Sequence, residues 1–198
     1  MARYPNFELV TAPIEEPVTL AEAKEHCTVE HAEHDDMITR MIAAARRHIE
    51  SQYGLALVTQ THKATVDAFP ESGLKLRPYP VAELESVEVW TGSAFTAQSL
   101  STYLLVKGRP AAAYLTDGVP APLPARTRAG VVVTFTAGFG DDSTEMPEDI
   151  KQACLLLVAH WYANREASIS SKTGFGVSAE LTRGVSDLLA PYRSPRLI

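Results

Sequence analysis

A helix start and a wide apolar face coincide in MPEDIKQACLLLVAHWYANRE, residues 146–166. Pro147 suits the first position of a helix, and Glu148 and Asp149 suit its first turn, where carboxylates interact favourably with the helix dipole. Apolar side chains then recur at helical spacing: Ile150, Ala153, Cys154, Leu157, Val158, Trp161 and Tyr162. This spacing predicts a core helix over residues 146–166, against which the other amphipathic segments of the chain pack.

Two further helices are predicted towards the N-terminus. In PVTLAEAKEHC, residues 17–27, Thr19 and Glu22 have the spacing of a capping box, which starts a short helix. A longer helix begins near Asp35 and ends at Gly54, with apolar residues at intervals of three and four. The core of the helical part is expected to contain Ile42, Ile49, Ile150, Cys154, Leu157 and Trp161.

The pattern between these helical regions is typical of β-strands. Strand-like runs are LVTQTHKATVDAF (57–69), LKLRPYPVAELESVEVW (74–90) and VVVTFTAGFG (131–140). Glycines punctuate them as turns. The proline-rich GVPAPLPARTRAG (118–130) lacks the backbone donors of a central strand, so we expect an exposed loop or edge there. Residues 55–140 are therefore predicted to form a small antiparallel β unit inserted between the helices.

The C-terminal part of the chain differs in composition from both the helical and the β-rich regions. Residues 167–179, ASISSKTGFGVSA, are small and polar, and they predict a mobile loop. Residues 188–198, LLAPYRSPRLI, mix apolar and basic side chains with two prolines, and they predict an extended arm. The expected organisation is α+β: residues 1–54 helical, 55–140 β-rich, 141–166 the core helix, and 167–198 a flexible loop and arm.

Composition favours an ordinary globular protein. Apolar residues make up 45% and charged residues 21%, and the formal net charge is −6. The acidic excess lies in the helical ends, which argues against a protein whose main task is to grip nucleic acid. The sequence shows no signal peptide and no apolar run of about 18 residues. With only two cysteines, Cys27 and Cys154, we expect no disulfide framework and a reducing cytoplasm.

Several groups of residues contain side chains that could bind a metal ion or act in catalysis, but none shows a complete motif. Metal-ligand types cluster at Cys27, His31, His34 and Asp35, yet no second cluster completes four ligands. The carboxylates Asp141, Asp142 and Glu145 precede the core helix, where helix-start chemistry explains them as well as an ion site does.

Phosphate loops and nucleophilic catalysis are equally poorly supported. The GFG triplets at 138–140 and 174–176 lack the Lys and Ser or Thr of a phosphate loop. Ser93 and His160 have no recognisable catalytic partner. We therefore expect no cofactor, no metal and no enzymatic activity.

Four segments, taken in order, resemble the head-tail connector family, the adaptor or head-completion proteins of long-tailed double-stranded DNA phages, prophages and gene transfer agents. These segments are PVTLAEAKEHC with the following helix MITRMIAAARRHIESQYG, then LRPYPVAELESVEV, then VVVTFTAGFG with the core helix, and finally LLAPYR at 188–193. The resemblance implies a helical bundle of the N-terminal helices and the core helix, with the β unit inserted.

The resemblance also implies a role and partners. It implies a ring, commonly of twelve subunits, between the portal protein and a tail-side stopper or tail-completion protein, with DNA only as passing cargo and no membrane. Such a protein resides in the host cytoplasm during assembly and then in the particle neck. The alternatives are a binding module of a phage particle and a small hydrolase.

Two functional segments are predicted from this resemblance and from composition. The arm is expected to dock on the portal through Leu188, Leu189, Tyr192, Arg193, Arg196 and Leu197. The loop, with Ser170, Lys172, Gly174, Phe175 and Gly176, is expected to face the channel or a neighbouring subunit.

Overall fold

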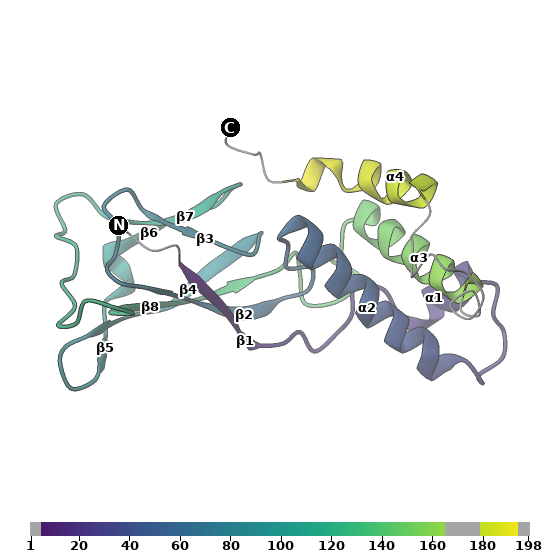
Figure 1. Cartoon of the computed structure of the whole chain (residues 1–198), viewed down its shortest axis with the longest axis horizontal. Helices are drawn as coiled ribbons and strands as arrows, with labels where there is room; N and C mark the ends of the chain where they lie inside the picture. The colour runs from purple at the N-terminus through teal and green to yellow at the C-terminus, as the bar shows by residue number, and fades with distance from the viewer. Residues whose placement is uncertain (1–4, 165–178, 194–198) are drawn as a thin grey trace. The chain divides into compact units, whose positions relative to one another are not determined.

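The fold is α+β, as the sequence predicts, and it divides into two compact units (Figure 1). The structure is a computed structural model that describes residues 5–164 and 179–193. One unit, the β unit, contains Gly54–Phe139 and the N-terminal residues up to Pro13; the other, the helical unit, contains Ile14–Tyr53 and the chain from Gly140 onward. The described residues form four α-helices and two antiparallel sheets.

The predicted capping box is present at the start of the helical unit. Helix α1 spans Leu20–His26, and the Thr19 hydroxyl accepts a hydrogen bond from the Glu22 amide at 3.2 Å. In return, the Thr19 amide donates to the Glu22 carboxylate at 2.6 Å. Two amides at the helix start, those of Thr19 and Glu22, are thus satisfied locally, which favours a helix even in so short a segment.

Helix α3, Glu148–Ala163, lies at the centre of the helical unit, since it packs against α1, α2 (Asp35–Tyr53) and α4 (Ala179–Leu188) (Figure 1). It begins and ends within the predicted 146–166. Of the residues predicted for the core, Trp161 keeps part of its surface exposed and meets His48 edge-on, with the ring centroids 6.2 Å apart. The others are at most 2% exposed: Ile42, Ile49, Ile150, Cys154 and Leu157.

The arm predicted from Leu188 is not extended in the part of it that the structure describes. Helix α4 spans Ala179–Leu188, and the 3₁₀ turn η3 follows at Ala190–Tyr192. Between them, Leu189 is completely buried. The prediction was wrong because Leu189, four residues after the buried Val185, continues an apolar face. Burial of this face within the helical unit stabilises the helical conformation. Residues 194–198 lie outside the described range.

A five-stranded antiparallel sheet forms the larger layer of the β unit, in the order β1-β2-β8-β4-β5. Its strands are β1 (Asn6–Thr11), β2 (Gln60–Val66), β8 (Val131–Ala137), β4 (Val81–Trp90) and β5 (Phe95–Ala97). Strand β1 corrects the assignment of residues 1–54 to helices alone. It is an edge strand of the sheet and pairs with β2, with Glu8 opposite Lys63.

The second layer is a three-stranded sheet in the order β3-β7-β6 (Figure 1). Its strands are β3 (Leu74–Leu76), β7 (Ala111–Leu115) and β6 (Tyr103–Val106), the last of which follows the 3₁₀ turn η1 (Leu100–Thr102). Each sheet buries alternate residues, such as Phe135 in β8 and Leu76 in β3. Alternation of this kind puts the core on one face of each sheet and leaves the other face in solvent.

The proline-rich segment 118–130 forms a loop without strands, pinned to the edge of the larger sheet. The Arg126 guanidinium lies over the rings of Trp90 and Phe95, 4.5 and 4.8 Å from their centroids. The Ala125 amide also donates to the Trp90 carbonyl at 2.8 Å. Leu123, at the exposed part of this loop, has 91% of its surface accessible.

Candidate functional site

The carboxylates ahead of α3 organise the backbone. The Asp142 carboxylate accepts hydrogen bonds from the Thr144 amide at 2.7 Å and the Thr144 hydroxyl at 2.6 Å. These bonds, first of all that from the hydroxyl, lower the pKa of Asp142. Glu145 accepts from the Asp141 amide at 2.7 Å and lies so close to Gly140 that a Cβ there would sit 2.3 Å from its own Cβ. The group therefore shapes a turn into the helix.

The metal-ligand types near the start of α2 are engaged elsewhere. The Asp35 carboxylate forms an ion pair with the Lys24 ammonium at 2.6 Å. His34 Nδ1 lies 2.8 Å from the Tyr162 hydroxyl on α3. Burial raises the pKa of the Cys27 thiol, which disfavours the thiolate that a metal needs. Within residues 5–164 and 179–193, no three His, Cys, Asp or Glu side chains are grouped to hold a metal ion.

The isolated candidates for catalysis also have structural partners. His160 lies in the last turn of α3, where Asn164 Nδ2 is 3.2 Å from its Nδ1. Ser93 lies in the turn from β4 to β5, after Gly92 with its positive φ of 110°. In the first GFG triplet, a Cβ on Gly138 would meet the Thr59 backbone at 2.5 Å, so the glycine permits a close chain crossing. Gly174 and Gly176 of the second triplet are outside the described residues.

The predicted docking residues divide into three groups. Leu189 is buried within its own unit and cannot anchor a partner. Leu188 and Tyr192 are partly exposed, and Arg193 is exposed. Arg196 and Leu197, together with the loop residues Ser170, Lys172, Gly174, Phe175 and Gly176, lie outside the described residues.

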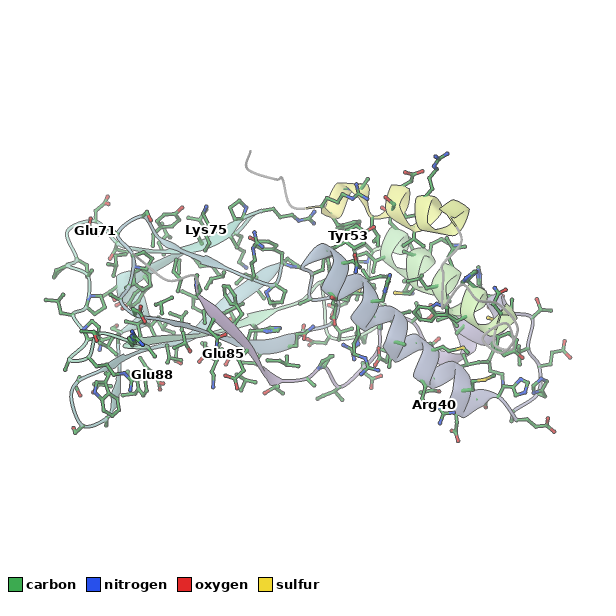
Figure 2. All side chains as sticks on the ribbon, viewed as in Figure 1. Arg40, Tyr53, Glu71, Lys75, Glu85 and Glu88 are labelled. Atoms are coloured by element: carbon green, nitrogen blue, oxygen red, sulfur yellow. The ribbon has the colours of Figure 1, made fainter. Side chains whose placement is uncertain are left out.

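Arg193 is held on the helical unit by two contacts. Its guanidinium donates to the Ser186 hydroxyl on α4 and lies 5.8 Å from the centroid of the Tyr53 ring at the end of α2. Contacts with α4 and with the end of α2 therefore hold the Arg193 guanidinium in position at the surface. Figure 2 labels Tyr53 and also Arg40, an exposed arginine of α2.

The outer side of the five-stranded sheet is an acidic face. Glu83 lies opposite Thr136 in this face, whereas Glu88 lies between Val132 and Ala97. Its strands carry four carboxylates and one ammonium, and the Arg126 guanidinium lies over Trp90 and Phe95 at one end: the charged strand residues are Glu8, Glu83, Glu85, Glu88 and Lys63. Glu8 pairs with Lys63 at 2.9 Å, and Glu85 accepts a hydrogen bond from Thr61 at 3.3 Å. Within the described residues, neither Glu83 nor Glu88 forms an ion pair, so the face carries a net negative charge.

The outer side of the three-stranded sheet is apolar and basic. Leu104 lies opposite Tyr114 and Val106 opposite Ala112, and Lys75 flanks Ala112 on the other side. Leu104, Val106 and Tyr114 are 55%, 45% and 37% exposed. We call these residues with Lys75 the apolar-basic face. Sequence analysis overlooked both faces, although the alternation of Leu104 and Val106 on either side of Leu105 is a signal for one of them.

Comparison with known proteins gives one family and one fold. A family model described as head completion protein matches residues 16–193. No curated protein sequence matches the chain. Solved structures of gene transfer agent (GTA) particles contain similar chains. One is in the neck of an empty GTA particle computed with C6 symmetry, with TM-score 0.77, 23% identity, and coverage of 98% of this chain and 97% of that chain.

Two further GTA structures contain chains of the same fold. In the virion of the native GTA particle, the TM-score is 0.76 at 24% identity, with 97% of each chain covered. In the neck of the native particle computed with C12 symmetry, the TM-score is 0.70 at 25% identity, with 98% of this chain and 97% of that chain covered. The likeness extends over both units of the chain.

Proposed function

The chain belongs to the head completion protein family, and on that basis we propose that it is a structural subunit of the neck of a phage-like particle. The observation that carries the proposal is the family match over residues 16–193, joined to a likeness of fold to GTA neck chains over nearly the whole length. The family is structural and not enzymatic.

In the proposed role, identical subunits form a ring beneath the portal and join the DNA-filled head to the tail. The neck structures that contain similar chains were computed with C6 and C12 symmetry, which supports a cyclic arrangement, and we propose twelve copies. A cyclic ring needs two different surfaces on each subunit, one for each neighbour. The β unit offers two exposed faces of different chemistry.

DNA would pass through this ring as cargo. Proteins that hold DNA neutralise its phosphates with clusters of Lys and Arg, and a net charge of −6 is the opposite of that requirement. A channel of such subunits would guide DNA without gripping it. The proposed partners are the portal protein on one side and a tail-side stopper or tail-completion protein on the other. The subunit would be made in the host cytoplasm and end in the particle neck.

We propose further that the chain docks on the portal through its C-terminal segment. The partly exposed Leu188 and Tyr192 and the exposed Arg193 would provide the fixed part of the contact, and Arg196 and Leu197 would continue it. Each segment would bind weakly by itself, while a ring presents many copies at high effective concentration. Residues 170–176 are proposed to face the channel or a neighbouring subunit.

The role is tested by adding the purified chain to rings of the portal protein from the same genome and imaging the mixture by cryo-electron microscopy. We expect extra density for a ring of this chain on one end of the portal. Arg193→Ala, and separately a chain ending at Arg193, should bind less. Arg40→Ala, which removes an exposed arginine of the same unit, should bind like the unaltered chain. Failure of the unaltered chain to bind portal rings would refute the proposal.

A further inference from the structure

We propose that copies of this chain associate head to tail through their β units, with the apolar-basic face of one copy against the acidic face of the next. This inference deepens the proposed function and rests on it, because the ring supplies a second copy as the occupant of each face. Both faces belong to one compact unit.

The first step is that the apolar-basic face is built to be covered. Leu104 and Val106 lie on β6, an edge strand, and together with Tyr114 they expose neighbouring apolar surface. Apolar side chains that adjoin one another on a sheet face, rather than being scattered singly, indicate an interaction surface. An uncovered edge strand beside such a patch is a site that natural proteins usually protect.

The second step is that Tyr114 is held in place before any partner arrives. Its ring lies directly on Gly73: a Cβ added to that glycine would be 2.4 Å from Tyr114 Cε1 and 2.5 Å from Cδ1. The ring therefore lies against the sheet, in the space that a side chain at position 73 would fill, while 37% of the residue stays exposed. A preorganised aromatic side chain loses little conformational freedom on binding, and such residues often dominate the affinity of an interface.

The third step is charge complementarity. Lys75 lies on β3, at one edge of the apolar-basic face, and Lys107 lies in the adjoining β6–β7 hairpin. Glu71, ahead of β3, is outnumbered by these cations. The acidic face offers Glu83 and Glu88 for them, with Ser86 between the two along β4. Complementary charge of this kind orients one copy on the next and disfavours contact between two like faces.

The fourth step is direction. Figure 2 shows Lys75 on one side of the β unit and Glu85 and Glu88 on the other. Contacts between two different faces on opposite sides of one body repeat in the same sense from copy to copy. Such heterologous contacts generate a closed ring or a filament rather than an isolated dimer.

The test uses the full chain and charge reversal. The unaltered chain should form oligomers that grow with concentration and dissociate with added salt, in sedimentation velocity and mass photometry. Lys75→Glu and Glu88→Lys should each raise the concentration for half-association by about tenfold, because each places like charges opposite one another. An equimolar mixture of the two variants should associate again. The reversed charge at position 75 of one variant then meets the reversed charge at position 88 of the other, and the two unaltered faces meet each other.

A matched pair of leucine variants tests the apolar part. Leu104→Ser should weaken association, whereas Leu123→Ser, which alters a more exposed leucine outside both faces, should not. An unaltered chain that stays monomeric at every concentration, a mixture that associates no better than its single variants, or equal effects of the two leucine changes would each overturn the inference.

Failure of this inference is distinguishable from failure of the proposed function. If Lys75→Glu and Leu104→Ser enter particle necks as readily as the unaltered chain, the faces do not join the copies but the neck role stands. If the faces join copies in solution while the unaltered chain is absent from particle necks, the neck role fails and the pairing of faces stands.

Discussion

The Lys151 ammonium on α3 lies 2.8 Å from the Glu22 carboxylate on α1. The same carboxylate accepts the Thr19 amide at 2.6 Å, so one side chain both caps α1 and joins it to the central helix. Sequence reasoning found the local half of this arrangement. The link to Lys151 crosses 129 residues and needed the packed structure.

Glu22→Gln should lower stability near neutral pH and have little effect in acid. Burial raises the pKa of Glu22, but the hydrogen bonds from Lys151 and Thr19 outweigh it, and the pKa is lowered overall. A lowered pKa in the folded state contributes stability above the unfolded pKa, about 4.3, and this contribution is lost as the pH falls through the folded pKa. Urea unfolding at pH 7 and pH 3 measures it. Glu25→Gln, an exposed carboxylate of α1, is the control.

Leu157→Ala should reduce the free energy of unfolding by about 2 to 5 kcal/mol, because the side chain is 1% exposed and its removal leaves a cavity. Leu155→Ala changes the same atoms at a half-buried position of the same helix and should cost less. Chemical denaturation of the two variants decides the matter. Equal losses would contradict the central place given to the Leu157 face of α3.

Leu189→Ala should destabilise the helical unit, again by about 2 to 5 kcal/mol, since Leu189 is completely buried. An extended arm would predict no effect from this substitution. Leu188→Ala, at the neighbouring and partly exposed position, should have the smaller effect. Thermal melts of both variants, followed by circular dichroism, distinguish a docked C-terminal segment from a free one.

Gly73→Ala should be more destabilising than Gly118→Ala. Both glycines have similar positive φ, 82° and 80°, so the backbone strain of about 1 to 2 kcal/mol is common to the two variants. At Gly118 no atom lies within 4 Å of the new Cβ, whereas at Gly73 it would overlap the Tyr114 ring. The difference in unfolding free energy therefore measures how firmly Tyr114 is seated. Equal losses would show that the ring moves aside freely.

Thiol labelling should separate the two cysteines. Cys154 is fully buried, and burial raises the pKa of its thiol; Cys27 is only partly buried, although burial raises its pKa as well. A thiol reagent at pH 8 should modify Cys27 slowly in the native protein and reach Cys154 only after denaturant is added. Peptide mass spectrometry identifies each site. Rapid labelling of Cys154 without denaturant would contradict its place in the core.

The predicted elements that held are those whose signals are local. Each of these signals depends on residues a few positions apart in the chain: the apolar spacing of α2 and α3, the Thr19–Glu22 capping box, and the β-branched run of β8. The missed strand β1 has weak alternation and is mostly exposed, because it is stabilised by pairing with β2 more than by burial of its own side chains.

The sequence by itself determined the fold class, the central helix and the family resemblance, since helix periodicity and caps are encoded within short windows. Only the tertiary structure decided that Leu189 is buried, that Tyr114 lies on Gly73, and that Lys75 and Glu88 occupy different faces of one unit. These relationships depend on strand order and register. Strand order and register are determined by pairing between segments that lie far apart in the chain, and no local sequence pattern indicates which strands pair.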